Sequence, residues 1–236
     1  MDRPDLVIFD CDGVLIDSEV ISARMLIAEL AGYGVHIDMA YVARHFLGRS
    51  YPVVLAQIRA EYDVLLPDGF EAEYRARLID AFRADLRIMP GVRAVLDRLE
   101  VPFHLATSSS PERLAQSLSI VGLADVFAGR MTTASEVARG KPAPDLFLHV
   151  ARLRGVRPDR CLVIEDSQAG IRSALAAGME VWRFTGGSHL KGLSLTEDRG
   201  IGEGPGGGAQ REFASFDEFF HLAPALHRKD APQDGR

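Results

Sequence analysis

The chain reads Asp10-Cys11-Asp12-Gly13-Val14-Leu15-Ile16-Asp17-Ser18-Glu19 directly after a short apolar run, Leu6-Val7-Ile8-Phe9. Such a run predicts a strand buried on both faces, so two carboxylates emerge where a buried strand ends. Side chains two residues apart in an extended segment point to the same side, which places Asp10 and Asp12 in one small volume. Carboxylates this close repel each other unless a cation or a shared proton relieves the charge. The pair is typical of a Mg²⁺ site or of a nucleophile with its acid/base, although a polar turn with Ser18 as helix cap has the same pattern.

The composition is that of an ordinary globular protein. The 236 residues are 47% apolar and 25% charged, enough for one large domain or two modest ones. The net charge of −6 argues against broad nucleic-acid binding, which usually needs a basic surface. No apolar run approaches membrane-spanning length and no signal peptide precedes the first strand, so we expect a cytoplasmic protein without a membrane partner. Cys11 and Cys161 are the two cysteines, and we expect no disulfide.

Strand-like apolar runs recur along the chain with helical patterns between them. After Leu6–Phe9, the predicted strands are Phe103–Thr107, Cys161–Glu165 and Glu180–Phe184. The predicted helices around them are Gly91–Leu99, Pro111–Val121, Asp145–Leu153 and Ala169–Ala177. This alternation is typical of βαβ units and predicts an α/β fold with a Rossmann-like parallel sheet. In such sheets the ligand lies beyond the carboxyl ends of the strands.

The segment 18–89 differs from the rest because it lacks a convincing strand. Its helical stretches are Glu19–Tyr33, Met39–Phe46, Pro52–Tyr62 and Gly69–Arg83. Met89-Pro90-Gly91 marks a turn at its end. We interpret the segment as an α-helical cap domain inserted into a discontinuous core formed by residues 1–17 and 90–226. A cap joined by two linkers can close over the edge of the sheet as a lid.

The chain after Gly186 is less regular. Residues 202–208 are rich in glycine, but they follow no predicted strand and open no predicted helix. They therefore predict a mobile surface loop rather than a dinucleotide site. We expect a last helix over Phe213–Leu226 and a flexible tail over residues 227–236.

Three further polar motifs follow the predicted strands or precede a helix. Thr107-Ser108-Ser109 offers hydroxyls and backbone N–H groups to an anion at a helix N-terminus, or simply caps that helix. Lys141, followed by two nearby prolines, can present a point charge to phosphate, or it is a solvated lysine. Glu165-Asp166 ends an apolar strand and favours a divalent cation, or else a capped turn with Ser167. Together these residues are typical of Mg²⁺-assisted phosphoryl transfer.

The motifs resemble those of the haloacid dehalogenase (HAD) superfamily, in the branch of β-phosphoglucomutase-like enzymes and sugar-phosphate phosphatases with a helical cap. Asp10-Cys11-Asp12-Gly13-Val14 is similar to the first motif and Thr107-Ser108 to the second. Lys141 is similar to the third motif and Glu165-Asp166 to the fourth. The resemblance extends from about Leu6 to Phe184, and the position and helical character of the cap are part of it.

The resemblance implies a mechanism and a set of site residues. Asp10 attacks phosphorus and forms an aspartyl-phosphate, while Asp12 protonates the leaving oxygen and then activates water. An aspartate at position 12 favours phosphate esters over haloacids, because the dehalogenases of this superfamily carry a tyrosine there. The residues expected around Mg²⁺ are Asp10, Asp12 through its carbonyl, Asp166 and Glu165. The residues expected to hold the phosphate oxygens are Lys141, Thr107, Ser108 and Ser109.

Substrate choice should lie in the cap. Gly48-Arg49-Ser50 is a turn between two predicted helices, where the family places a specificity loop. Arg49 could pair there with a sugar acid or a second phosphate, although a surface arginine in a helix–helix turn has the same pattern. Arg75 and Arg77 are similar candidates. The histidines without metal-ligand spacing, which we expect to be structural or solvent-facing, are His36, His45, His104, His149 and His189.

We therefore expect a Mg²⁺-dependent phosphatase that acts on a small phosphorylated sugar or sugar acid, as a monomer or weak homo-oligomer. One alternative is a sugar phosphomutase, and another is a non-catalytic protein that binds phosphorylated metabolites. The binder would be expected to lose Asp10, Asp12 or the metal carboxylates, and none is missing. The mutases of the β-phosphoglucomutase type carry a histidine twelve positions after the nucleophile, where this chain has Ser22.

Overall fold

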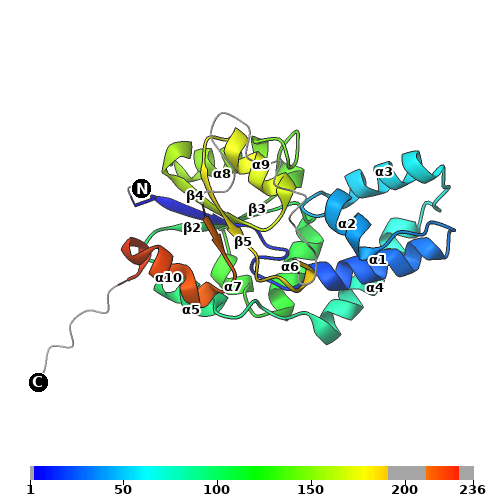
Figure 1. The fold of residues 1–236 in the computed structure, drawn as a ribbon, viewed down its shortest axis with the longest axis horizontal. Coiled ribbons are helices and arrows are strands. Elements are labelled where there is room, and N and C mark those ends of the chain that lie inside the picture. The colour runs from blue at the N-terminus through cyan, green and yellow to red at the C-terminus, as the bar shows by residue number, and fades with distance from the viewer. Residues whose placement is uncertain (1–2, 191–210, 229–236) are drawn as a thin grey trace, which may run out of the picture.

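A computed structural model of the protein describes residues 3–190 and 211–228. Helices cover both faces of a central parallel sheet (Figure 1). The four helices between residues 19 and 85 extend from one end of it (Figure 1). The strands point with their carboxyl ends toward these four helices (Figure 1). The predicted fold class, a Rossmann-like parallel α/β core with an inserted helical cap, is confirmed.

The sheet has six parallel strands in the order β3-β2-β1-β4-β5-β6. Four strands have the predicted bounds: β1 is Leu6–Phe9, β2 is Phe103–Thr107, β4 is Cys161–Glu165 and β5 is Glu180–Phe184. The two outer strands, β3 (Met131–Thr133) and β6 (Arg211–Phe213), are absent from the sequence prediction. Both are short and partly exposed, so they lack the apolar run that marks a buried strand.

Strand β1 separates two apolar cores, because its side chains alternate between the faces of the sheet. Val7 and Phe9 belong to the larger core, and Leu6 and Ile8 to the smaller one. The helices on the larger core are α5 (Val92–Arg98), α6 (Pro111–Ile120), α7 (Ala124–Phe127) and α10 (Phe219–Leu222). The helices on the smaller core are α8 (Asp145–Arg154) and α9 (Gln168–Ala176).

Four helices form the segment between β1 and α5: α1 (Glu19–Ala31), α2 (Met39–His45), α3 (Tyr51–Tyr62) and α4 (Phe70–Asp85). The chain enters and leaves this segment side by side, since Ile16 bridges Ile88 and the N–H of Met89 donates to the Leu15 carbonyl at 2.9 Å. The larger apolar core continues from the sheet into these helices. We propose residues 18–89 as the cap, because the segment that enters these helices pairs with the segment that leaves them.

The prediction of one helix over Phe213–Leu226 is wrong. Phe213 ends β6, and the segment after it consists of the short α10 between two 3₁₀ turns at residues 216–218 and 224–226. Phe213 and Phe216 pack against Phe184 of β5, with ring centroids 5.2 and 4.7 Å apart. Packing of aromatic side chains onto the sheet thus overrides the helical pattern of the sequence.

Some predictions concern residues at the limits of the described chain. His227 and Arg228 of the predicted tail pair with Leu99 and Arg98. The glycine-rich residues 202–208 and residues 229–236 lie outside the described residues. Cys11 and Cys161 are buried and free. Among the helices that the structure describes, none is long and apolar enough to cross a membrane.

Candidate active site

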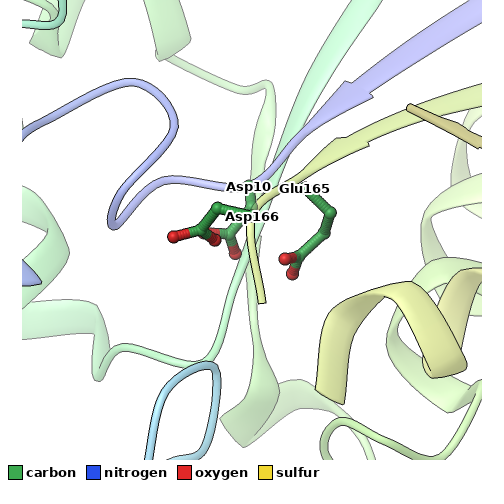
Figure 2. A group of neighbouring side chains, drawn as sticks. All are labelled: Asp10, Glu165 and Asp166. Atoms are coloured by element: carbon green, nitrogen blue, oxygen red, sulfur yellow. The ribbon is translucent and has the colours of Figure 1, made fainter. Parts of the chain in front are cut away.

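Asp10 lies at the carboxyl end of β1, beside the residues that end β4. The two strands pair in parallel with Phe9 opposite Ile164, so Asp10 stands next to Glu165 and Asp166. Carboxylate oxygens of these three buried residues lie within 4.8 Å of one another. Figure 2 shows the carboxylates of Asp10 and Asp166 together, whereas that of Glu165 points to the other side. Burial, together with repulsion from neighbouring carboxylates, raises the pKa values of Asp10 and Asp166 well above the usual range.

Lys141 places a positive charge between two of these acids. Its Nζ donates to Oδ1 of Asp10 at 2.5 Å and to Oε1 of Glu165 at 2.6 Å. The side chain has no exposed surface, and its ammonium lies 5.1 Å from the centre of the Phe147 ring. Burial alone would lower the pKa of Lys141, but the two carboxylates outweigh burial and raise it. Lys141 is therefore a buried, immobilised cation rather than a solvated lysine.

Glu165 is held by the turn that joins β4 to α9. Its Oε2 accepts hydrogen bonds from the N–H and the hydroxyl of Ser167 at 2.8 and 3.0 Å. A side chain at Gly170 would collide with the Glu165 carboxylate, so the glycine leaves room for it. Since Oε1 accepts from Lys141, both oxygens of Glu165 have protein donors.

Asp166 has an oxygen that protein donors leave unpaired. Its Oδ2 is buried and has no hydrogen-bond partner among the described residues, although Nε2 of His189 lies 2.9 Å away. Burial lowers the pKa of His189, which therefore brings no positive charge near neutral pH. An unpaired carboxylate oxygen beside Asp10 fits a hard divalent cation, which prefers oxygen ligands.

Asp12 has a different environment from Asp10. Its Oδ1 accepts from the Ser18 hydroxyl at 2.6 Å and from Arg113 at 2.8 Å. Its Oδ2 accepts from the Ser109 hydroxyl at 2.6 Å. Burial raises the pKa of Asp12, but Arg113 and the two hydroxyls outweigh burial, and the pKa is lowered. Ser18 makes no side-chain capping bond to α1, so its hydroxyl serves Asp12 instead.

The loop after β2 connects the sheet edge to the cap. Thr107 Oγ1 accepts the N–H of Ser109 at 3.0 Å, and the Ser108 hydroxyl donates to the Gly48 carbonyl at 2.8 Å. Gly48 has φ of 74° and passes so close to Ser167 that a side chain there would collide with it. The predicted specificity turn therefore rests directly on the sheet edge.

A cavity of about 390 Å³ lies between the sheet edge and the cap, and both aspartates of the first motif line it. Arg49, Ser50 and Arg75 line it from the cap side. Arg49 donates to the Gln57 side-chain oxygen at 3.2 Å, while Arg75 pairs with Glu71 and donates to the Ser110 hydroxyl at 2.7 Å. The cavity-lining residues do not include Arg77, which pairs with Glu29.

Comparison with known proteins identifies the family. A family model described as haloacid dehalogenase-like hydrolase matches residues 4–178, most of the chain. The chain belongs to the haloacid dehalogenase-like hydrolase family.

Three relatives show how similar this HAD-like hydrolase is to known proteins. The 6-phosphogluconate phosphatase of Escherichia coli (strain K12) is 31% identical over 193 residues, which cover 81% of this chain and 87% of the relative. Hexitol phosphatase A of the same strain is 34% identical over 191 residues, which cover 74% and 80%. The crystal structure of a conserved haloacid dehalogenase-like protein of unknown function from Agrobacterium tumefaciens is 35% identical with a TM-score of 0.75, over 94% of this chain and 98% of the other. The predicted family branch and enzyme class, a phosphoric monoester hydrolase, are confirmed.

Sequence reasoning missed two residues at the site of this HAD-like hydrolase. Arg113 lies in the first turn of α6 and contacts Asp12. The sequence feature that could have indicated Arg113 is a positive charge in the first turn of a predicted helix, where the helix dipole disfavours a cation. His189, expected to be structural or solvent-facing, is buried beside Asp166. The sequence feature that could have indicated His189 is the pair Gly186-Gly187 just before it, because a side chain at Gly187 would collide with the imidazole.

Proposed function

We propose that the protein is a Mg²⁺-dependent phosphatase that hydrolyses a small phosphorylated sugar or sugar acid through an aspartyl-phosphate on Asp10. The contrast between two aspartates at one strand end carries this proposal. Asp10 contacts the ammonium of Lys141, whereas Asp12 accepts from two hydroxyls and a guanidinium. One carboxylate is thus placed to attack and the other to move a proton, as phosphate ester hydrolysis requires.

Each aspartate has its own part in the proposed reaction. A carboxylate oxygen of Asp10 forms a bond to phosphorus while the bond from phosphorus to the sugar oxygen breaks. The lowered pKa of Asp12 leaves it ionised in the free enzyme, so the proton enters with the substrate as its phosphate monoanion, and Asp12 passes it to that oxygen, which leaves as an alcohol. Asp12 then takes a proton from water, whose oxygen bonds to phosphorus, and Asp10 is restored as inorganic phosphate departs. Lys141 keeps Asp10 in place and offers its charge to the phosphate oxygens. The Thr107 hydroxyl can donate to the same oxygens, whereas the hydroxyls of Ser108 and Ser109 already donate to the Gly48 carbonyl and to Asp12.

Mg²⁺ fits the residues present at this end of the sheet. Asp10 and Asp166 offer carboxylate oxygens, one of which lacks a hydrogen-bond partner among the described residues. The backbone carbonyl of Asp12 is the third proposed ligand. When bound, the cation supplies positive charge to the carboxylates and to the incoming phosphate. We assign Glu165 to the orientation of Lys141 rather than to the metal, because both its oxygens have protein donors.

The relatives and the cap side of the cavity support the proposed substrate class. One relative is named a 6-phosphogluconate phosphatase and another a hexitol phosphatase. Arg49 lines the cavity and bonds to the neutral side chain of Gln57, so its charge is available to an anionic substrate group. Arg75, by contrast, already pairs with Glu71. We propose that Arg49, presented by Gly48 and Ser50, recognises the carboxylate of a sugar acid.

The environment of Ser22 favours a phosphatase over a mutase. Ser22 lines the cavity, and its hydroxyl donates to the Ser18 carbonyl at 2.9 Å. Serine cannot supply the hydrogen bonding of the imidazole that related mutases carry at this position. We therefore propose that water, rather than a second sugar oxygen, discharges the phosphoenzyme.

Phosphate release from a panel of phosphorylated metabolites, with and without Mg²⁺, tests the proposed function. We expect Mg²⁺-dependent hydrolysis of 6-phosphogluconate or a hexitol phosphate, and no hydrolysis by Asp10→Asn. Aldose 1-phosphates, with and without the matching bisphosphate, are followed for both phosphate release and isomer formation. Accumulation of 6-phosphate isomers without free phosphate would favour the mutase instead. Binding of these esters without any turnover would favour the non-catalytic alternative.

The location, oligomeric state and partners of the proposed enzyme stay predictions. These are a cytoplasmic location, a monomeric or weakly oligomeric state, and a small phosphorylated substrate as partner without nucleic acid or membrane.

A further inference from the structure

Arg113 lines the cavity, and the proposed reaction names it only as one of the donors to Asp12. It lies in the first turn of α6, after Ser110 and Pro111, and its side chain is 20% exposed. The helix dipole disfavours a cation at this end, and burial of a guanidinium costs free energy unless a partner compensates. A charged residue that is placed against the preferences of its helix position and of burial is typical of functional positions.

The compensating partner of Arg113 is the acid/base carboxylate. The same guanidinium nitrogen lies 2.8 Å from Oδ1 of Asp12 and 3.3 Å from the hydroxyl of Ser22. Two serine hydroxyls donate to the Asp12 carboxylate as well, but a hydroxyl carries no net charge. Arg113 therefore contributes the charge and the planar group that set the direction in which Asp12 faces.

Cap residues hold the guanidinium of Arg113 in turn. Its central carbon lies 5.3 Å from the centre of the Phe82 ring on α4, and Ser22 belongs to α1. The Tyr74 hydroxyl of α4 donates to the Ser22 carbonyl at 3.1 Å, so α1 and α4 meet at Ser22, the residue that Arg113 contacts. Arg113 belongs to the core, yet it touches the cap on one side and Asp12 on the other.

We propose that Arg113 is a positioning residue that aligns Asp12 for proton transfer and makes this alignment depend on the seating of the cap. The inference rests on the proposed phosphatase reaction. Proton transfer matters most when an alkoxide leaves, whereas a nitrophenolate departs without a proton. Loss of Arg113 therefore harms the hydrolysis of alkyl phosphates far more than that of aryl phosphates.

The experiment compares kcat/KM of Arg113→Met and of the wild-type enzyme on p-nitrophenyl phosphate and on the fastest alkyl phosphate of the panel. This parameter reports the steps up to departure of the leaving group. We expect a loss of about 10²-fold for the alkyl ester and of less than about fivefold for the aryl ester. Arg113→Lys, which keeps the charge without the planar fork, should restore part of the alkyl activity. Arg93→Met is the matched control, because Arg93 donates to the Gly122 carbonyl just beyond the other end of α6.

A double mutant separates positioning from general damage to the fold. In an Asp12→Asn background, Arg113→Met should leave the ratio of alkyl to aryl activity unchanged, because its target is gone. Equal losses on both esters, or a further change of the ratio in that background, would overturn the proposal. Arg113→Gln replaces the Met variant if the latter does not fold. A wild-type enzyme without turnover contradicts the proposed function and this inference together, whereas an active enzyme with an unchanged ratio contradicts only the role of Arg113.

Discussion

Lys141 at the sheet edge and Arg77 in the cap both pair with carboxylates, but they differ in burial. Lys141 is fully buried and bonds to Asp10 and Glu165 at 2.5 and 2.6 Å. Arg77 leaves 47% of its side chain exposed and pairs with Glu29 at 2.7 Å. An exposed ion pair contributes about 0–1 kcal/mol to stability, whereas breaking a buried pair leaves a charge that nothing compensates.

The difference shows which part of the molecule tolerates change. At the sheet edge, Lys141 is the buried cation that compensates Asp10 and Glu165, so its removal leaves two buried carboxylates without a positive partner. In the cap, Arg49 is exposed and holds one neutral partner, so its loss alters substrate affinity and leaves the reacting groups in place. The following variants break or sharpen this contrast.

The largest effect is expected for Asp10→Asn, which removes the nucleophile. Turnover should fall by roughly 10⁴-fold or more, while the thermal unfolding temperature stays close to wild type. Phosphate release and circular dichroism check the two expectations. The matched control is Asp5→Asn at an exposed position just before β1, where the aspartate pairs with Arg160. Substantial turnover by Asp10→Asn, free of contaminating enzyme, would contradict the assignment of the nucleophile.

Lys141→Met and Arg77→Met compare the two ion pairs directly. We expect Lys141→Met to lower the free energy of unfolding by about 3–5 kcal/mol near pH 8, because Asp10 and Glu165 stay buried without a cation. The loss should shrink as the pH falls, because burial raises the pKa of Asp10 and protonation then neutralises this carboxylate. Arg77→Met should change stability by less than about 1 kcal/mol. Equal losses in urea denaturation would remove the distinction between core and cap.

Arg49→Ala sharpens the contrast on the cap side. The KM for 6-phosphogluconate should rise about tenfold, equivalent to the loss of about 1.4 kcal/mol of binding. The KM for a hexitol phosphate, which lacks the carboxylate, should rise less than about twofold. Arg77→Ala serves as the control, since Arg77 does not line the cavity. A rise shared equally by both substrates would mean that Arg49 does not recognise the carboxylate.

The smallest effect is expected for Glu19, which begins the cap next to the sheet edge. Burial, reinforced by the charge of Asp12, raises the pKa of Glu19 from 4.5 to about 7. The folded protein therefore holds a proton that the unfolded chain releases, so stability is present below pH 4.5 and is lost as the pH rises to about 7. Glu19→Gln should flatten this decline in the thermal unfolding temperature of metal-free protein, whereas Glu218→Gln at an exposed position should not. Parallel curves for the wild type and Glu19→Gln would show that this carboxyl titrates normally.

The sequence predicts the buried part of the fold well, because burial leaves a pattern in the residues. Strands β1, β2, β4 and β5 have uninterrupted apolar runs, and their predicted bounds match the structure. Strands β3 and β6 lie at the sheet edges and expose Met131, Arg211 and Glu212, so no such run marks them. The predicted last helix fails because Phe213 and Phe216 pack on Phe184, a long-range contact that a local pattern does not contain.

The same physical difference applies to the candidate site. Asp10, Asp12, Glu165 and Asp166 follow apolar strands, so the rule for strand ends places them together. Arg113 and His189 come from a helix turn and a loop, and only the tertiary structure brings them to Asp12 and Asp166. The sequence also assigns Glu165 to the metal, whereas its hydrogen bonds to Lys141 and Ser167 become visible only in three dimensions.

Trapping the phosphoryl group on the enzyme tests the central claim most directly. Asp12→Asn is mixed with p-nitrophenyl phosphate and Mg²⁺, quenched in acid and digested for peptide mass spectrometry. Because the aryl group leaves without a proton and the amide cannot activate water, the phosphoenzyme should accumulate. We expect the mass of one phosphoryl group on the peptide that contains Asp10, and none when Asp10→Asn is added. Nitrophenol release with no phosphorylated peptide, or with the phosphoryl group on another residue, would contradict the account.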